Sequence, residues 1–275
     1  MSRGQDAAPI WARPEPGGRR PRLSREAIAA AALDVADRDG FDALTMRRLA
    51  AELGVGTMTL YRYVRNKDEL VALMHDRLMA ESLVPEGELP TDWRAALGAV
   101  ARRTRAVVLR HPWTLLAFQE AQFGPNAMRH FEQSLAAVAG MSLDPAGKFE
   151  LLSLVDDYVI GNVLHASEAR TRARLAAESP DLVRAAVEFG MRQLESGAFP
   201  HTAALLRTAA PGGQGTPGPV MDERGLDEQF ERGLAAVLDG VAARLGIGPA
   251  DARLGGTHAP TSRARSDGAG GAPAV

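Results

Sequence analysis

The fold of this 275-residue chain is decided by residues 44–70, LTMRRLAAELGVGTMTLYRYVRNKDEL. Thr45 can cap a short helix that ends near Gly54, a residue free to adopt a left-handed conformation, and a second short helix follows. Ala50 is small enough for the two helices to cross closely. The crossing would be fixed by four apolar side chains, Leu49, Leu53, Val55 and Leu60. The other side chains are mostly Arg, Thr and Tyr, which can reach phosphates and base edges, so the stretch predicts a helix-turn-helix.

Positive charge is concentrated in the same part of the chain. The whole protein has a formal net charge of −2, which alone would not suggest a nucleic-acid binder. Residues 43–67, however, hold five arginines and lysines against a single acidic side chain, Glu52, which leaves −6 for the remainder. A compact basic patch on a mildly acidic body is typical of a phosphate-binding surface.

The sequence around this stretch predicts an all-α protein. Alternating β-branched runs are few, and apolar residues recur at helical spacing. Ser24 can cap a helix that ends at Gly40, and Asn66 can cap another, with Glu69 placed to complete a capping box. Longer helices are expected in the second half, near residues 91–111, 126–139, 145–175, 180–196 and 225–246.

Composition divides the chain into four parts. Pro, Gly and Arg dominate its first residues, and Gly, Ala and Pro its last, so both ends are predicted to be disordered, with Trp11 exposed. A Gly- and Pro-rich stretch at 209–219 predicts a surface loop. The predicted organisation is an arm at 1–21, a three-helix domain with the helix-turn-helix at 22–82, a second helical domain at 83–248 and a tail at 249–275.

The composition also excludes several kinds of site. Without cysteine there can be no disulfide, thiol nucleophile or zinc–thiolate centre. No apolar run is long enough to span a bilayer and no secretory signal follows the N-terminal arginines, so we expect a soluble, cytoplasmic protein. His165 and Glu168 share a helix face, where a surface or interface pair is a better interpretation than a metal site. No catalytic set is recognisable, and we expect neither an enzyme nor a cofactor nor a bound metal.

The helix-turn-helix resembles the DNA-binding domain of the TetR family over about residues 22–82. The positions that fit the family pattern are Phe41, Leu44-Thr45, Arg47, Leu49-Ala50, Leu53-Gly54-Val55, Thr59-Leu60-Tyr61, Val64 and Asn66-Lys67. The second half is similar, more loosely, to the tetracycline-repressor-like C-terminal domain, through DWRAALGAVARRTRAVVLRHP, FELLSLVDDYVIGNVLHASE and FERGLAAVLDGVAARL. The resemblance implies a DNA-binding transcription regulator whose second domain binds a small molecule and dimerises.

The resemblance also implies a set of DNA contacts. Arg47 corresponds to a residue that reaches a guanine edge, which an arginine fork can hydrogen-bond. Thr57 and Met58 occupy base-reading positions, and together with Gly56 they are where operator preference should differ from that of relatives. Contacts to phosphate are implied for Thr59, Tyr61, Tyr63 and Lys67.

Other interpretations remain open for some of these side chains. Arg62 is included among the predicted DNA contacts, but Arg62, Arg48 and Arg65 could each lie on a solvated helix face. Tyr61 could be a core residue whose hydroxyl reaches the surface, which is compatible with a phosphate contact.

The second domain needs a cavity if it binds an effector. Its rigid walls could come from Trp113, Phe118, Phe123, Phe131 and Tyr158, each of which could equally be a plain core residue. The positions that hold tetracycline and magnesium in the best-known relatives fall at Leu83, Val100, Thr104 and Phe118, of which Val100 and Thr104 are also predicted to line the pocket. Only the weak Thr104 hydroxyl could serve a hard cation there, so we expect a larger, more apolar effector than tetracycline–magnesium.

A single helix-turn-helix makes few contacts, so we expect a homodimer on a palindromic double-stranded operator, with recognition helices about 34–36 Å apart. The helices near 145–175 and 225–246 would form the dimer seam, where Gly161 and Gly233 allow close approach. Repression relieved by the effector is the family's usual sense, transmitted through the helix that starts at Asn66, although an activator would look the same. An enzyme with an appended DNA-binding domain and a ligand-free architectural protein are the alternatives.

Overall fold

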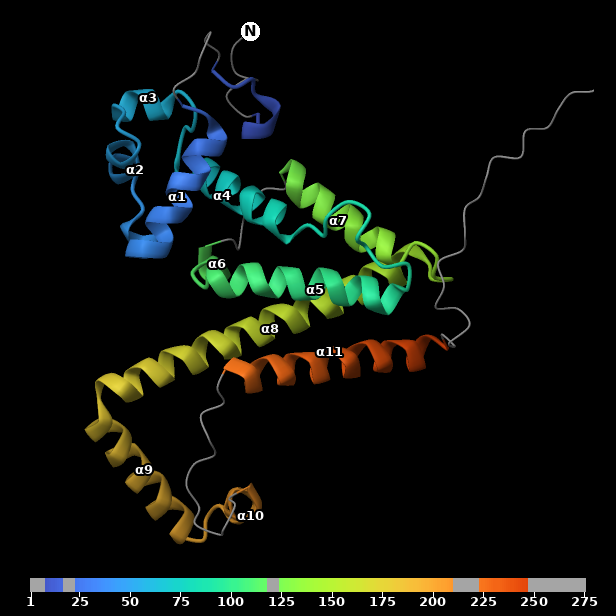
Figure 1. The fold of residues 1–275 in the computed structure, drawn as a ribbon. Coiled ribbons are helices and arrows are strands. Elements are labelled where there is room, and N and C mark those ends of the chain that lie inside the picture. Colours follow the sequence, from blue (N-terminus) through green and yellow to red (C-terminus); the bar gives the residue numbers. More distant parts are fainter. Residues whose placement is uncertain (1–7, 17–22, 118–123, 210–222, 247–275) are drawn as a thin grey trace, which may run out of the picture.

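The computed structural model describes residues 8–16, 23–117, 124–209 and 223–246, and within these ranges the chain forms helices and no strand (Figure 1). The all-α prediction is confirmed. The helices are α1 (Arg25–Asp39), α2 (Met46–Glu52), α3 (Thr57–Tyr61), α4 (Lys67–Ser82), α5 (Trp93–Arg110), α6 (Thr114–Ala117), α7 (Pro125–Ala137), α8 (Pro145–Glu178), α9 (Pro180–Glu195), α10 (Pro200–Ala209) and α11 (Glu223–Leu245). Two 3₁₀ turns, η1 (Ile10–Ala12) and η2 (Phe41–Ala43), precede and follow α1.

The first helices begin and end where the sequence places capping residues. Side-chain oxygens of Ser24, Thr45 and Asn66 accept hydrogen bonds from amides three residues later, over 3.0, 3.1 and 2.8 Å. Gly40 and Gly54 have φ angles of 87° and 63°, which a residue without a Cβ adopts freely. These capping and turn predictions are confirmed, because they depend only on local chemistry.

Helices α1 to α4 pack around one apolar core and form what we call the N-terminal unit (described residues up to 82). The core includes Ile28, Ala32, Val35, Leu44, Leu49, Ala50, Leu60, Val64, Leu70 and Met74. Of the side chains predicted to fix the helix crossing, Leu49 and Leu60 are fully buried, and Leu53 and Val55 pack partly buried against the same core. The crossing of α2 and α3 is therefore held as predicted.

The first described residues belong to the N-terminal unit and do not form the free arm that was predicted. Ile10 has 0% of its surface exposed and lies in the core, with Trp11 packed beside it. The Arg25 guanidinium donates to the carbonyls of Ile10 and Arg13 over 2.9 Å each, and Arg13 forms an ion pair with Glu69 of α4. The prediction of an exposed Trp11 is wrong, because the Ile10-Trp11 pair buries apolar surface that outweighs the flexible composition around it.

The described residues beyond 82 form a C-terminal domain built on α5, α7, α8 and α11. Its core includes Trp93, Leu97, Leu151, Val155, Val159, Phe230 and Leu234. The 34-residue α8 runs through the domain and beyond it, and α9 and α10 continue from its far end, away from the other helices (Figure 1). The predicted loop at 209–219, beyond its first residue, and the predicted tail at 249–275 lie outside the described ranges.

Helix α4 joins the two parts. The buried carboxylate of Asp76 accepts hydrogen bonds from the backbone amides of Asn126 and Ala127, in the first turn of α7, over 2.8 and 3.0 Å. A side chain at Gly124 would collide with Asp76 and with the Trp11 ring. The helix predicted to link the two parts is thus fastened to both.

Candidate nucleic-acid interface and effector region

Most residues predicted to contact DNA expose their side chains on α2, α3 and the start of α4. Met58 in α3 is 79% exposed and Tyr61 is 41% exposed, so the core alternative for Tyr61 is not supported. Arg47, Gly56, Thr59, Arg62 and Lys67 are exposed as well, and Thr57 is half-buried. A short helix with an exposed N-terminal half and basic neighbours is suited to enter a DNA groove.

Tyr63 is the exception among the predicted contacts. Only 8% of its surface is exposed, and it belongs to the core of the N-terminal unit. The structure therefore favours a packing role over the predicted phosphate contact. The sequence carried a signal for this, since Leu60, Tyr63 and Val64 follow helical spacing and so share the buried face.

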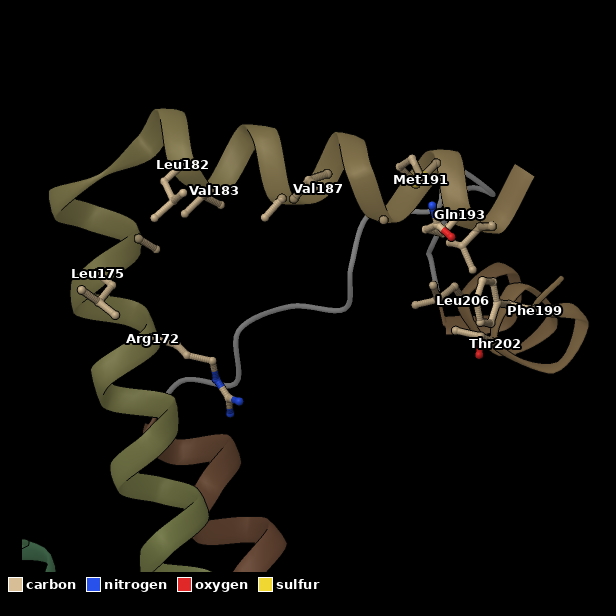
Figure 2. A pocket seen from close by; sticks show the side chains of 14 residues that line it. Arg172, Leu175, Leu182, Val183, Val187, Met191, Gln193, Phe199, Thr202 and Leu206 are labelled. Atoms are coloured by element: carbon tan, nitrogen blue, oxygen red, sulfur yellow. The ribbon is translucent and has the colours of Figure 1, made fainter. Parts of the chain in front are cut away.

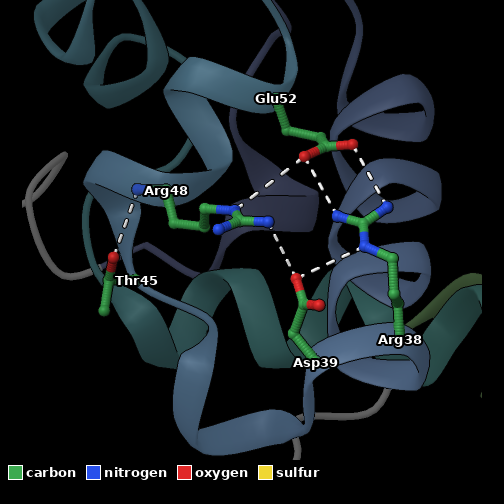
Figure 3. Close-up of polar contacts among 5 residues, drawn as sticks. All are labelled: Arg38, Asp39, Thr45, Arg48 and Glu52. Atoms are coloured by element: carbon green, nitrogen blue, oxygen red, sulfur yellow. Dashed lines mark hydrogen bonds and ion pairs between the residues drawn. The ribbon is translucent and has the colours of Figure 1, made fainter.

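An ion network joins the end of α1 to α2, as Figure 3 shows. Arg48 Nη2 lies 2.8 Å from Asp39 Oδ2, and Arg38 Nη2 lies 3.1 Å from Glu52 Oε2. Two longer pairs, Arg38–Asp39 at 3.3 Å and Arg48–Glu52 at 3.9 Å, complete it. Arg48 thus braces α2 against α1. Glu52 is paired with cations, so the only acidic side chain of the basic segment 43–67 does little to oppose a phosphate.

Trp113, predicted to line the effector pocket, lies instead where the C-terminal domain meets the N-terminal unit. Its ring stacks on Phe41, with centroids 5.4 Å apart and planes inclined by 8°. Its indole nitrogen donates to Asp37 Oδ1 over 2.7 Å, and His111 Nδ1 lies 2.8 Å from the same oxygen. The corner between α5 and α6 is therefore held against the end of α1, and the structure gives Trp113 a contact between the two parts, while its role as a pocket wall stays a prediction.

The other predicted pocket residues are dispersed. Tyr158 stacks on Phe230 at 5.6 Å and donates its hydroxyl to the Phe230 carbonyl, which is the plain core role. Phe131 packs partly buried against the core of the C-terminal domain, and Val100 of α5 is buried. Phe118 and Phe123 lie outside the described residues.

A half-buried polar cluster, formed by His75, Thr104 and His130, lies between α4, α5 and α7. Thr104 Oγ1, at a predicted pocket position, is 2.9 Å from His130 Nε2. Burial lowers the pKa of His130, and nearby His75 lowers it further; burial also lowers the pKa of His75. Both imidazoles are therefore neutral at neutral pH. Sequence inspection missed this cluster because its members come from three different helices.

A groove of about 700 Å³ is formed by the end of α8 together with α9 and α10 (Figure 2). Its walls are mostly apolar: Leu182 on α9 lies near Leu175 of α8 at one end, and Phe199 and Leu206 lie near Met191 at the other. Arg172 of α8 also lines it. None of the residues predicted to hold an effector lines this groove.

Metal-ligating side chains are dispersed over the described ranges. No three His, Asp or Glu side chains there come together in a group that could hold a metal ion. His165 and Glu168 are exposed on α8. None of the helices described is both long and apolar enough to cross a membrane.

Two protein-family models match the chain, covering the N-terminal unit and the C-terminal domain in turn. The model for bacterial regulatory proteins of the tetR family matches residues 28–74, and that for the tetracyclin repressor-like C-terminal domain matches residues 86–245. The HTH-type transcriptional repressor DrrR1 of Streptomyces coeruleorubidus is 38% identical over 228 residues, 82% of this chain and 79% of that one. The chain belongs to the TetR family. It is a DNA-binding transcriptional regulator and not an enzyme.

Solved structures of TetR-family proteins share the fold. ActR of Streptomyces coelicolor, solved in complex with actinorhodin, is 27% identical with a TM-score of 0.61, covering 82% of this chain and 100% of that one. TetR from Acinetobacter baumannii, at 23% identity and a TM-score of 0.53, covers 81% and 98% and supports the fold alone. The recognition of the family from its helix-turn-helix is confirmed.

Proposed function

We propose that this TetR-family regulator is a repressor that binds a near-palindromic operator as a homodimer and leaves it when a small molecule binds the C-terminal domain. The observation that carries the proposal is the exposed basic surface of α2, α3 and the start of α4, where Glu52, the one acidic residue of segment 43–67, is already paired. The relative DrrR1 is named as a repressor, which supports repression over activation.

The surface provides both kinds of contact that an operator requires. Arg47 offers a fork that can hydrogen-bond a guanine, and the exposed Met58 can meet base edges beside it. Thr59, Tyr61 and Lys67 are placed on the same unit to hold phosphates, which fixes register without reading sequence. Gly56 and Thr57 begin α3, so they accompany Met58 into the groove.

The apolar side chains left exposed on α8 and those that line the groove support a homodimer. Ile160, Leu164 and Leu175 of α8 are 44%, 49% and 50% exposed, and spacings of four and eleven residues put them on one helix face. Leu175 also lines the groove, so this stripe continues into it. A second copy of the chain, related by a two-fold axis, would cover the stripe and the groove together.

The predicted role of Gly233 at the dimer seam is wrong, whereas that of Gly161 stays a prediction. A side chain at Gly233 would collide with the Tyr158 ring of the same chain. Gly233 is therefore needed for packing α11 on α8 within one protomer. At Gly161 an added Cβ would meet nothing within 4 Å, which leaves that position open to a partner.

The effector is proposed to be larger and more apolar than tetracycline–magnesium. Leu83 and Val100 offer a hard cation no ligand, and the Thr104 hydroxyl is already engaged with His130. ActR, at 27% identity, was solved in complex with actinorhodin and not with a tetracycline, which supports this proposal. A cytoplasmic location belongs to the same proposal.

Selection of bound fragments from the source genome, followed by titration of the recovered site, tests the proposal. We expect a near-palindrome bound by a dimer, with preference over a scrambled duplex lost in Arg47→Ala. Equal binding of both duplexes by the unaltered protein would contradict the proposal and favour an architectural DNA-binding protein.

A further inference from the structure

A stack of three side chains runs from the C-terminal domain to one predicted DNA contact. Trp113, between α5 and α6, lies against Phe41 of η2 in the near-parallel stack described above. Lys67, the first residue of α4, places its Nζ 4.4 Å from the centroid of the Phe41 ring. The indole of the C-terminal domain therefore supports the ring on which the lysine ammonium lies.

The position of Lys67 is not explained by helix stability. A cation in the first turn of a helix opposes the helix dipole, and the following residues, Asp68 and Glu69, are the acidic type that this position favours. The Phe41 ring offsets this cost, because the face of an aromatic ring attracts an ammonium group. The chain thus holds a lysine at the exposed start of α4, close in sequence to α3.

We propose that Trp113 is a positioning residue for operator binding, which acts by holding Phe41 under Lys67. The inference rests on the proposed phosphate contact of Lys67. A lysine that is already ordered loses less side-chain freedom when it meets a phosphate, so support from Trp113 strengthens that contact.

The same stack couples the two parts of the molecule. Trp113 and His111 both contact the Asp37 carboxylate of α1, so the α5–α6 corner has one well-defined position against the N-terminal unit. A displacement of this corner removes the support beneath Lys67 even if α4 does not move. The C-terminal domain therefore has a route to the DNA contact that is additional to the linking helix.

Operator binding by full-length variants across a salt series tests the proposal. Each lost phosphate contact reduces the magnitude of the negative slope of log K against log salt by roughly one. Lys67→Ala should therefore reduce that magnitude by about two in a dimer, with an affinity loss of roughly tenfold. Trp113→Leu should also reduce both the magnitude of the salt slope and the affinity for the operator. Trp113→Phe keeps an aromatic ring and should stay within about twofold of the unaltered protein.

A double substitution separates positioning from general weakening. In a Lys67→Ala background, Trp113→Leu should change the salt slope no further, because the contact it supports is already gone. An affinity loss in Trp113→Leu without a slope change, or an equal effect in both backgrounds, would overturn the proposal. Arg47→Ala is the control: if it loses operator preference while Lys67→Ala has no effect, this inference fails and the proposed function stands.

Discussion

The N-terminal unit and the α9–α10 segment differ in how far they bury their apolar residues. In α1, six residues are buried, and the core they enter is completed within the same chain, by α2 to α4 and by Val107 of α5. In α9, none is buried, and Leu182 is 69% exposed although it faces a groove lined by other apolar side chains. Both segments are amphipathic helices, but only α1 finds its apolar partner in the same chain.

The N-terminal unit has an apolar core that one chain completes, whereas the apolar side chains of α9 would need a second molecule to cover them. Water penalises exposed apolar surface in proportion to its area, and contiguous exposed apolar patches mark interaction sites. The N-terminal unit presents polar and basic side chains instead, as expected of a surface that meets DNA. Its exposed surface is polar and basic, whereas that of α8 to α10 carries apolar side chains.

The largest expected effect lies in the core of the N-terminal unit. Leu49→Ala removes a fully buried side chain and should lower the free energy of unfolding by about 2–5 kcal/mol. Met58→Ala, a truncation of an exposed residue in the next helix, should change it by less than about 0.5 kcal/mol. Urea unfolding measures both, and equal losses would break the contrast between buried and exposed positions.

A charge in the groove should act on assembly and not on folding. Leu182→Glu places a carboxylate on the apolar wall, and we expect the dimer dissociation constant to rise about a hundredfold with helix content unchanged. Leu205→Glu on α10 is the matched control, since Leu205 is exposed but does not line the groove. Sedimentation of both variants over a concentration series checks this, and an unaltered dimer in Leu182→Glu would mean that no second copy covers the groove.

Acid should distinguish the half-buried polar cluster from the rest of the molecule. Because the pKa values of His75 and His130 are lowered from 6.5 by burial, the unfolded chain binds protons more readily than the folded one. Their contribution to stability is therefore complete above pH 6.5 and is lost as the pH falls below it. Melting temperatures between pH 7.5 and 5 should decrease less steeply in His130→Gln than in the unaltered protein or in His201→Gln, which alters an exposed histidine. The same dependence of melting temperature on pH in all three proteins would contradict the lowered pKa of His130.

The smallest effect is expected in the ion network of Figure 3. Arg48 is half exposed, and exposed ion pairs contribute little, so Arg48→Gln should lower the free energy of unfolding by less than about 1 kcal/mol. If Arg48 only braces α2, operator affinity should fall little and the salt slope should be unchanged. A slope reduced by about one per protomer would show instead that Arg48 contacts phosphate.

The capping and turn residues of the N-terminal unit could be predicted because they act through local chemistry. The positions of residues held by tertiary contacts could not. Ser24, Thr45, Asn66, Gly40 and Gly54 act on neighbours only a few residues away, so their roles could be read from the sequence. Burial of Ile10 depends on the distant Arg25 and Glu69 that hold its segment, and the seat of Trp113 depends on Asp37 and Phe41. Composition and spacing contain no record of such pairings, which is why they predict a disordered arm for the first segment and do not predict the contact of Trp113 with Phe41.

The most direct test of a dimeric operator-binding regulator is a hydroxyl-radical footprint of the unaltered protein and of Arg47→Ala on the selected site. The account predicts two protected segments related by a two-fold axis, with centres one helical turn or a multiple of it apart, and their loss in the variant at the same concentration. A single protected segment, or protection that is uniform along the duplex and unchanged in Arg47→Ala, would contradict it.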